Sequence, residues 1–233
     1  MLKTIVFVKR REDISPEHFA RYWVEAHGPL TSHLPGLQHL RFNILRPDLQ
    51  RSPGIWDGVS CAWFSDDVTF ADIGLSDAFN AMLEDEENFV DTTRRSPLVV
   101  NENFPLGAPS KVCADGRSAM VKTITGIRKK AGLELADFTR DWHTQHAQLI
   151  TALPHMEAYT QNTINADVQR RGDYLFDAVA EVWWDSWQGV QEAVSSEAYK
   201  AVREDETRLV EPAGLTPLVV REIEIVRDSK LLV

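Results

Sequence analysis

The hydrophobic pattern alternates between short β-branched runs and longer helical stripes, and the same order of elements occurs twice. Residues 2–9 and 120–128 are β-branched runs typical of strands. Each is followed by a helical stripe, two strands, a second helix and a last strand. This β-α-β-β-α-β order is the ferredoxin-like unit. The remaining strands are expected at 37–45, 57–64, 97–104, 156–164, 177–184 and 217–226, and the second helices at 68–90 and 187–208.

The first helix of each half carries an inward-facing histidine near its C-terminal end. Ser15 and Pro16 favour a helix start, as an N-cap and a first helical residue. Phe19, Trp23 and His27 follow at intervals of four residues, which places them on one face of the helix. Residues 28 and 29 are Gly-Pro, which should bend or end that helix. The second half repeats the stripe with Phe138, Trp142 and His146.

The match between the halves is regular enough to indicate two fused copies of one domain. The offset is 119 residues as far as His27 and His146, and 120 residues from Asp57 and Asp177 onwards. We predict halves at 1–105 and 119–233, joined by a Pro- and Gly-rich linker at 106–118. Two equivalent domains can bury like surfaces as a homodimer does.

The third strands indicate how the halves meet. Trp63, Phe64, Trp183 and Trp184 are consecutive pairs, so apolar side chains should point to both faces of each sheet. Two helices cover only one face, and a large apolar face needs a cover. We therefore predict an α+β fold in which two ferredoxin-like repeats pair sheet to sheet as a dimeric α+β barrel within one chain. Further dimerisation of the fused barrel is left open.

Composition narrows the function classes. The net charge of −10 argues against nucleic acid as a partner, because phosphates would be repelled. No run of about 18 apolar residues exists, so we expect no membrane segment. Cys61 and Cys113 lack metal-type spacing and are expected to be free thiols in a reducing cytoplasm. The acidic run at 84–87 lies in a helical pattern and is expected to be a solvated face.

Residues 9–30 contain the string K-R-x(4)-S-P-E-x-F-x-R-Y-W-x(3)-H-G-P-L, followed by Leu-Pro-Gly-Leu at 34–37. The string resembles the EthD-like family of dimeric α+β barrel proteins. The resemblance covers both halves, about 1–105 and 119–228. It implies ferredoxin-like subunits that pair sheet to sheet, and activities such as lactone isomerase, polyketide cyclase, dehydratase, decarboxylase or monooxygenase that need no metal or organic cofactor.

The resemblance also implies site residues. The helix-1 histidine of such proteins commonly lines a pocket near a tyrosine of strand 2, which implies catalytic roles for His27, His146 and Tyr159. The first half has Leu40 where the second has Tyr159, so the two halves have diverged. Side chains expected to border the substrate are Trp23, Trp142, Trp183, His143 and His39.

These residue types suit proton transfer. A histidine both takes and gives a proton near neutral pH, and a tyrosine hydroxyl can hydrogen-bond a developing enolate oxygen. The first hypothesis is a cofactor-independent lyase or isomerase acting on a small aromatic, polyketide-like or lactone compound. The alternatives are a non-catalytic binder of an apolar metabolite and a cofactor-free monooxygenase. A structural role of each histidine at its helix end also stays open, and we expect no metal at His143 and His146.

Overall fold

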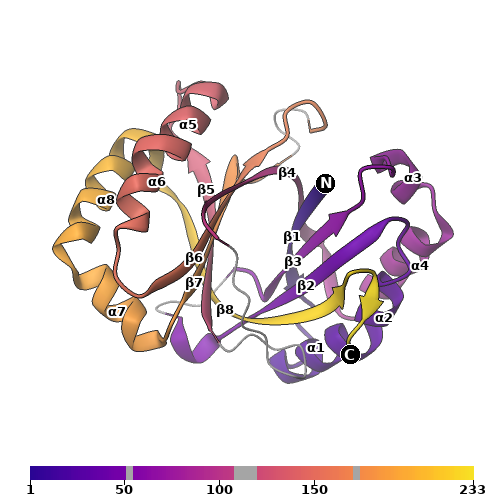
Figure 1. Cartoon of the computed structure of the whole chain (residues 1–233). Coiled ribbons are helices and arrows are strands. Elements are labelled where there is room, and N and C mark those ends of the chain that lie inside the picture. The colour runs from indigo at the N-terminus through magenta and orange to yellow at the C-terminus, as the bar shows by residue number, and fades with distance from the viewer. Residues whose placement is uncertain (51–54, 108–119, 170–173) are drawn as a thin grey trace. The chain divides into compact units, whose positions relative to one another are not determined.

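The structure, a computed structural model, describes residues 1–50, 55–107, 120–169 and 174–233 (Figure 1). The elements of the first half are β1 (Leu2–Arg10), α1 (Pro16–Tyr22), η1 (Trp23–His27), α2 (Gly28–Thr31), β2 (Leu37–Leu45), η2 (Pro47–Leu49), β3 (Gly58–Phe64), α3 (Phe70–Gly74), α4 (Asp77–Glu86) and β4 (Val90–Leu106). Those of the second are β5 (Val121–Lys129), α5 (Leu135–Asp141), η3 (Trp142–His146), α6 (Ala147–Thr151), β6 (Met156–Ile164), β7 (Ala178–Trp184), α7 (Trp187–Ser195), α8 (Glu197–Leu209), β8 (Val210–Arg227) and β9 (Lys230–Leu231).

The chain forms two compact units, and each of the long strands β4 and β8 contributes residues to both. Of the described residues, the first unit contains 1–50, 55–99 and 220–233, and the second contains 100–107, 120–169 and 174–219. The end of β4 pairs antiparallel with β6 in the second unit. The end of β8 pairs antiparallel with β2 in the first unit. Each unit thus completes its sheet with a strand end that the other half of the chain supplies.

The hydrogen-bonded strand order is β2-β3-β1-β4-β6-β7-β5-β8, and β8 also pairs with β2, so the order returns to its start. This connectivity is that of a dimeric α+β barrel, and each half has the β-α-β-β-α-β order. The predicted fold class is therefore confirmed. The predicted linker at 106–118 lies almost wholly outside the described residues.

The second helices differ from the prediction, because each is two helices. In the first half the break falls at Ser76, whose side chain accepts a hydrogen bond from the backbone of Phe79 and caps α4. Ser196 caps α8 in the same way through the backbone of Tyr199. A serine hydroxyl that satisfies a free N–H favours a new helix start. In the short α3, Ile73 is buried whereas Phe70, the first residue of the helix, is 48% exposed.

Strand alternation separates the two faces of each sheet. Phe64 and Trp184 pack into the helix-side cores of their units, so the preceding residues Trp63 and Trp183 point to the other face. The Lys3 ammonium lies 4.5 Å from the Trp63 ring, and that of Lys122 lies 4.3 Å from the Trp183 ring. Both lysines are buried. Apolar rings thus lie on both faces, as expected, and on the second face each tryptophan lies beside a buried lysine.

That second face holds a buried ion pair in the second unit. Lys122 Nζ lies 2.8 Å from a carboxylate oxygen of Glu181, and neither side chain has any exposed surface. Asn162 donates to the other oxygen of Glu181 at 3.1 Å. The first unit has Cys61, a buried cysteine, at the position of Glu181, whereas Cys113 lies outside the described residues. Buried charges survive only when they are paired and hydrogen-bonded in this way.

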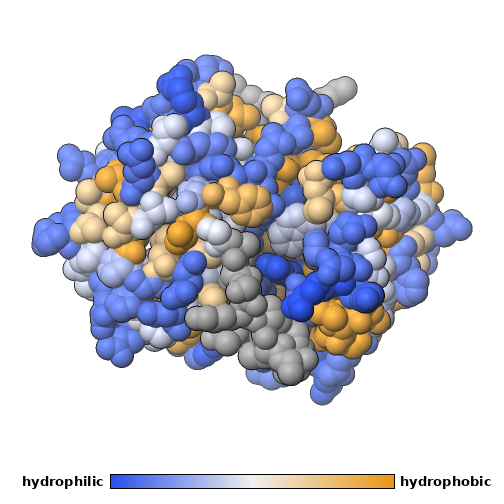
Figure 2. Space-filling view, viewed as in Figure 1, coloured by the Kyte–Doolittle hydropathy of each residue, from blue (hydrophilic) through white to orange (hydrophobic). Residues whose placement is uncertain are grey.

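Figure 2 shows mostly hydrophilic residues on the face that it presents, with smaller hydrophobic patches between them. None of the described helices is long and apolar enough to cross a membrane.

Candidate functional site

The helix that carries each histidine widens into a π-helical turn at that point. In the first half the N–H of Gly28 donates to the carbonyl of Trp23, five residues back, across η1. In the second half the N–H of Ala147 donates to the carbonyl of Trp142 across η3. His27 and His146 are the last residues of these two turns. Single π turns inside α-helices occur frequently at functional sites.

Each histidine forms a dyad with an aspartate of the second helix of its own half. His27 Nδ1 lies 2.8 Å from Oδ2 of Asp85, and His146 Nδ1 lies 3.0 Å from Oδ2 of Asp205. The histidine side chains are only 4% and 6% exposed. An ionised carboxylate is an acceptor only, so Nδ1 carries the hydrogen and Nε2 keeps its lone pair.

Burial keeps both rings neutral near pH 7. Burial lowers the pKa of His27 and of His146 below the ordinary value, outweighing the opposing effect of the paired aspartate in each case. Burial raises the pKa of Asp85, but hydrogen bonds from Tyr22, His27 and Asn88 outweigh it and bring this pKa below its usual value. Each dyad therefore consists of a neutral imidazole whose Nδ1–H donates to an aspartate oxygen.

The second ring nitrogen of each histidine remains available. Within the part of the chain that the structure describes, no hydrogen bond involves Nε2 of either ring. Neither atom is among the buried side-chain nitrogens that lack a partner. With the hydrogen on Nδ1, a neutral ring has a lone pair at Nε2 that could accept a proton.

The lowered histidine pKa values predict acid sensitivity of the fold. Above about pH 6.5 neither the folded nor the unfolded state holds the imidazole protons. Below it, the unfolded state binds protons that the folded state resists, so the free energy of unfolding falls as the pH is lowered toward the folded-state pKa values. Urea unfolding at a series of pH values measures this slope.

The matched variant is the double substitution His27→Gln and His146→Gln, which removes both titrating rings. Its free energy of unfolding should depend less steeply on pH between about 6.5 and 5. An unchanged slope in this variant would show that other groups cause the acid sensitivity.

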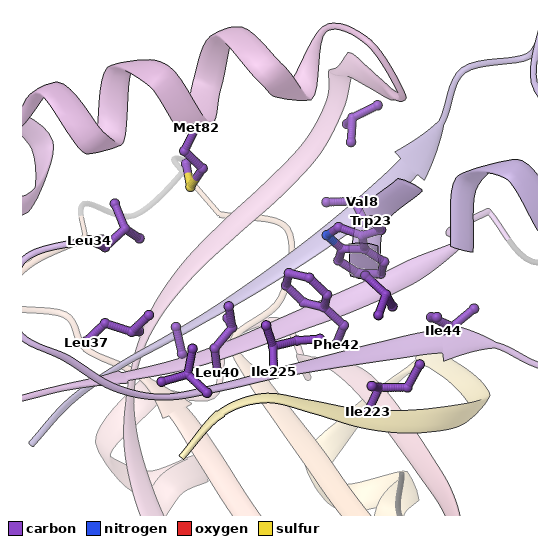
Figure 3. Packing of buried hydrophobic residues seen from close by; sticks show 14 of the residues in the cluster. Val8, Trp23, Leu34, Leu37, Leu40, Phe42, Ile44, Met82, Ile223 and Ile225 are labelled. Carbon is purple, nitrogen blue, oxygen red and sulfur yellow. The ribbon is translucent and has the colours of Figure 1, made fainter. Parts of the chain in front are cut away.

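The dyad of the first repeat is enclosed by a continuous apolar core. The Trp23 ring stacks on Phe42 at 4.4 Å between centroids, and the His27 ring lies 4.9 Å from that of Phe89. Figure 3 shows Trp23 over Phe42 and β2, with Ile223 and Ile225 of β8 in the same core. Tyr22 donates a hydrogen bond to Asp85 at 2.7 Å. In this environment the His27–Asp85 hydrogen bond can serve a structural role by connecting η1 to α4.

The corresponding core of the second repeat is divided in two by polar side chains. One cluster contains Tyr159 with Val182 and Val202, and the other contains Trp142 with Phe138 and Leu209. Polar residues replace apolar ones at two positions of β6, where Tyr159 corresponds to Leu40 and Gln161 to Phe42. The two repeats therefore share a dyad but differ in its surroundings.

The two polar side chains of β6, Gln161 and Tyr159, lie close to the π turn η3. Gln161 Nε2 donates to the carbonyl of Trp142 at 2.7 Å, and its amide oxygen accepts from Asn103 at 2.9 Å. Tyr159 is 1% exposed, and burial raises the pKa of its hydroxyl, as does the charge of Glu206, whereas Gln161 and Trp142 oppose this shift. The hydroxyl of Tyr159 thus lies near Trp142, four residues before His146.

The structure brings some predicted site residues together and separates others. Trp23 and Trp142 lie on the helix side with the histidines. His143 is half-buried with its ring 5.8 Å from that of Trp142. Trp183 and His39 are not part of this group: Trp183 faces the other side of its sheet, and His39 packs edge-on at 6.4 Å against Trp63 of that same face in the first unit. Their predicted place beside the histidines is not supported by the strand registers.

Sequence analysis missed both aspartates of the dyads. The acidic run at 84–87 was expected to be a solvated face, which is wrong for Asp85 and Glu86, whose side chains are 12% and 7% exposed. Met82, Glu86 and Phe89 form an inward stripe at helical spacing, and Asp85 lies beside them. The same spacing recurs in the second half at Val202, Asp205, Glu206 and Leu209. This repeated spacing is the sequence signal that could have identified the two aspartates.

A cleft of about 660 Å³ in the second unit lies elsewhere. Arg128, Tyr174, Asp177 and Glu211 are among its lining residues, and no predicted site residue is. Among the described residues, no group of three or more His, Cys, Asp or Glu could hold a metal ion.

The closed strand order and the duplicated histidine define the chain as a tandem protein of the dimeric α+β barrel class. Residues 11–93 and 130–213 each match the family model described as EthD domain. The chain therefore belongs to the EthD family. No curated protein matches it significantly.

Two solved structures of low identity, an anthrone oxidase-like protein and a chlorite dismutase, share the fold. An anthrone oxidase-like protein is 12% identical with a TM-score of 0.68, and the match covers 100% of this chain and 94% of that one. A mutant chlorite dismutase from Candidatus Nitrospira defluvii is 12% identical with a TM-score of 0.50, over 94% and 90% of the two chains. An EthD family protein from Bacillus halodurans is 21% identical, with a TM-score of 0.37, over 43% of this chain and 95% of its own.

Proposed function

We propose that the second repeat is a cofactor-independent acid–base site that acts as a lyase or isomerase on a small ring compound bearing a carbonyl group. The observation that carries the proposal is the buried His146–Asp205 dyad, with a neutral ring whose hydrogen lies on Nδ1, in the repeat whose core contains the polar side chains of Tyr159 and Gln161. In this proposal the reaction uses no metal ion or organic cofactor, and the protein acts in the cytoplasm.

The chemistry assigns one role to each group. His146 Nε2 takes a proton from a carbon beside the carbonyl, and the C–H electron pair forms a carbon–carbon double bond. The carbonyl oxygen then gains negative charge, which the hydroxyl of Tyr159 stabilises by a hydrogen bond. Asp205 holds the ring in the required tautomer and stabilises the imidazolium. The proton returns to another carbon in an isomerisation, or to a leaving hydroxyl when water is lost.

Deuterium exchange into anthrone tests this step before the natural substrate is known. Anthrone is a tricyclic ketone whose acidic methylene carbon is conjugated with the carbonyl across the central ring, so loss of its proton gives the same type of enolate as loss from a carbon beside the carbonyl. A protein similar in fold is described as anthrone oxidase-like. The purified protein in deuterated buffer without oxygen should accelerate loss of the anthrone methylene signal in proton NMR by about 100-fold or more over buffer alone. No acceleration contradicts proton abstraction from such ketones.

The same assay separates the other two hypotheses. A non-catalytic binder would be stabilised against heat by anthrone without exchange. A cofactor-free monooxygenase would consume oxygen with anthrone in air, and the methylene carbon would be oxidised. Oxygen uptake matched to product formation would replace the isomerase or lyase proposal.

A further inference from the structure

The aspartate of the second dyad is in contact with an arginine of its own helix. Asp205 holds His146 through Oδ2 at 3.0 Å. Its other oxygen, Oδ1, accepts from the side-chain amide of Gln145 at 3.0 Å and from a guanidinium nitrogen of Arg208 at 2.9 Å. A second guanidinium nitrogen of Arg208 pairs with Asp141, the last residue of α5. One guanidinium therefore connects the dyad to the helix that leads into the π turn.

The first dyad has neutral donors in the same places. Oδ1 of Asp85 accepts from the Tyr22 hydroxyl at 2.7 Å and from the Asn88 amide at 3.2 Å. Along the sequence, Asn88 corresponds to Arg208, and Tyr22 corresponds to Asp141. The histidine–aspartate pair is therefore common to both repeats, whereas a neutral tyrosine–asparagine pair in the first is replaced by a charged aspartate–arginine pair in the second.

Arg208 places a permanent positive charge beside the second dyad, because a guanidinium is not deprotonated in proteins. The side chain of Asp205 is only 4% exposed, so its contact with Arg208 is less screened by water and salt than an ion pair on the surface. Burial is the largest cause of the lowered pKa of His146, the paired aspartate opposes it, and the charge of Arg208 lowers this pKa further. The arginine and the aspartate thus act on the ring in opposite directions.

Among the described residues, no other charged group forms a hydrogen bond or ion pair with the second dyad. Charged or titratable groups in the surrounding elements α5, η3, β6 and α8 include Arg140, Asp141, His143, Tyr159, Arg203 and Glu206. In the first repeat, burial is the main cause of the lowered pKa of His27 and Arg95 of β4 adds to it, but the ion-pair partner of Arg95 is Glu86. Within the described chain, direct contact between a cation and a dyad aspartate therefore occurs only in the second repeat.

We propose that Arg208 is a positioning residue of the second repeat: it fixes the Asp205 carboxylate that orients His146 and balances its charge, so that the base stays unprotonated at lower pH than an unbalanced dyad would allow. This inference rests on the proposed function. Arginine suits the role because its planar fork binds two carboxylates at once, here Asp205 and Asp141.

The same contact favours return of the proton to the substrate. When His146 takes the carbon proton, the imidazolium lies beside a carboxylate whose charge Arg208 already balances. The ring therefore holds the proton less tightly than it would beside a free carboxylate, and it gives the proton back more readily. No bond forms or breaks at Arg208, which keeps its charge throughout.

The variant Arg208→Asn, which introduces the residue of the first repeat, tests the inference. In a nitrogen-15 NMR titration, the ring signals of His146, assigned with His146→Gln, should change at higher pH in Arg208→Asn than in the wild type. In the anthrone assay, the exchange rate below the wild-type midpoint should fall by about 3- to 10-fold. Well above the midpoint, where the ring is neutral in both proteins, the rate should change by less than about twofold.

Two further variants separate a local effect from a change in overall charge. Lys200→Asn removes one positive charge from the same helix, at a side chain that is 72% exposed and paired with Glu197. It should leave the titration of His146 close to that of the wild type, because exposed charges are screened. Arg208→Lys keeps the positive charge and should recover most of the wild-type pH profile. Equal titrations of His146 in Arg208→Asn and Lys200→Asn would overturn the inference.

The first repeat offers a reciprocal test that does not depend on the stability of Arg208→Asn. Asn88→Arg places a guanidinium where the amide now contacts Asp85. The ring signals of His27, assigned with His27→Gln, should then titrate at lower pH than in the wild type. An unchanged titration of His27 would contradict the effect assigned to the arginine.

The two failures are distinguishable. Exchange by the wild type, together with an unchanged titration of His146 in Arg208→Asn, would overturn the role of Arg208 and leave the proposed function standing. Absence of exchange by the wild type would overturn the proposed function, and the role of Arg208 in catalysis with it.

Discussion

Replacing His146 by glutamine should lower the rate of anthrone deuterium exchange by about 100- to 10,000-fold, the range that a positioned general base contributes. Glutamine can still hydrogen-bond to Asp205, so the clamp between η3 and α8 should persist, whereas the amide cannot accept a proton at neutral pH. The measurement is the initial rate of methylene exchange at saturating anthrone, with far-ultraviolet circular dichroism to confirm that the variant is folded.

His27→Gln is the matched control, because His27 has the same partner type and nearly the same burial in the first repeat. Phe42 and Phe89 flank its ring, and the nearby hydroxyl of Tyr22 donates to Asp85, so it is not directed at a developing oxygen charge. The exchange rate should stay within about twofold of the wild-type rate, because this substitution removes no group that takes part in the proton transfer. Equal losses in the two variants would contradict the assignment of chemistry to the second repeat alone.

Replacing Ile225 by alanine should destabilise the first unit by about 2–5 kcal/mol, the usual cost of truncating a buried isoleucine. Ile225 has no exposed surface, lies near the C-terminal end of the sequence and packs in the core formed by α1, η1 and β2. An added Cβ at Gly28 would lie only 3.0 Å from its Cγ2, which shows how closely helix and strand approach there. The midpoint of urea unfolding measures the change.

Val233→Ala is the control for this second prediction. Val233 is 42% exposed at the end of the same segment, and exposed substitutions usually change stability by less than about 0.5 kcal/mol. A midpoint for Ile225→Ala equal to that of Val233→Ala would show that the end of β8 is not part of the core of the first unit.

Much of the architecture could be predicted from the sequence because repetition tests each element twice. The β-branched runs, the Ser15 and Pro16 helix start and the aromatic stripe before each histidine have local causes that a single chain reveals. The inward direction of His27 and His146 followed from helical spacing, and both are buried.

The partners of the histidines were missed for a physical reason. Hydrophobic patterning treats charged residues as solvent-facing, yet Asp85 and Asp205 lie inside because each accepts a hydrogen bond from an imidazole and from other donors. Trp183 and His39 were placed with the histidines because aromatic residues suit a pocket. Strand alternation, given one known inward neighbour such as Trp184, puts Trp183 on the opposite face.

The exchange of strand ends could not be derived from local pattern. β4 has 17 residues and β8 has 18, and only their pairing with β6 and β2 shows where each passes from one unit to the other. Such pairings depend on contacts between residues far apart in the sequence, which periodicity does not report.

The π turn affects how insertions and deletions would act during evolution. A π turn holds one residue more than a regular helical turn, so deleting one residue from this turn would restore regular winding and leave the helix on either side facing as before. Deleting one residue from a regular helix would instead rotate everything beyond it by about 100°. The π turn is therefore the place where the first helix of each repeat could lose a residue while both of its flanks keep their packing.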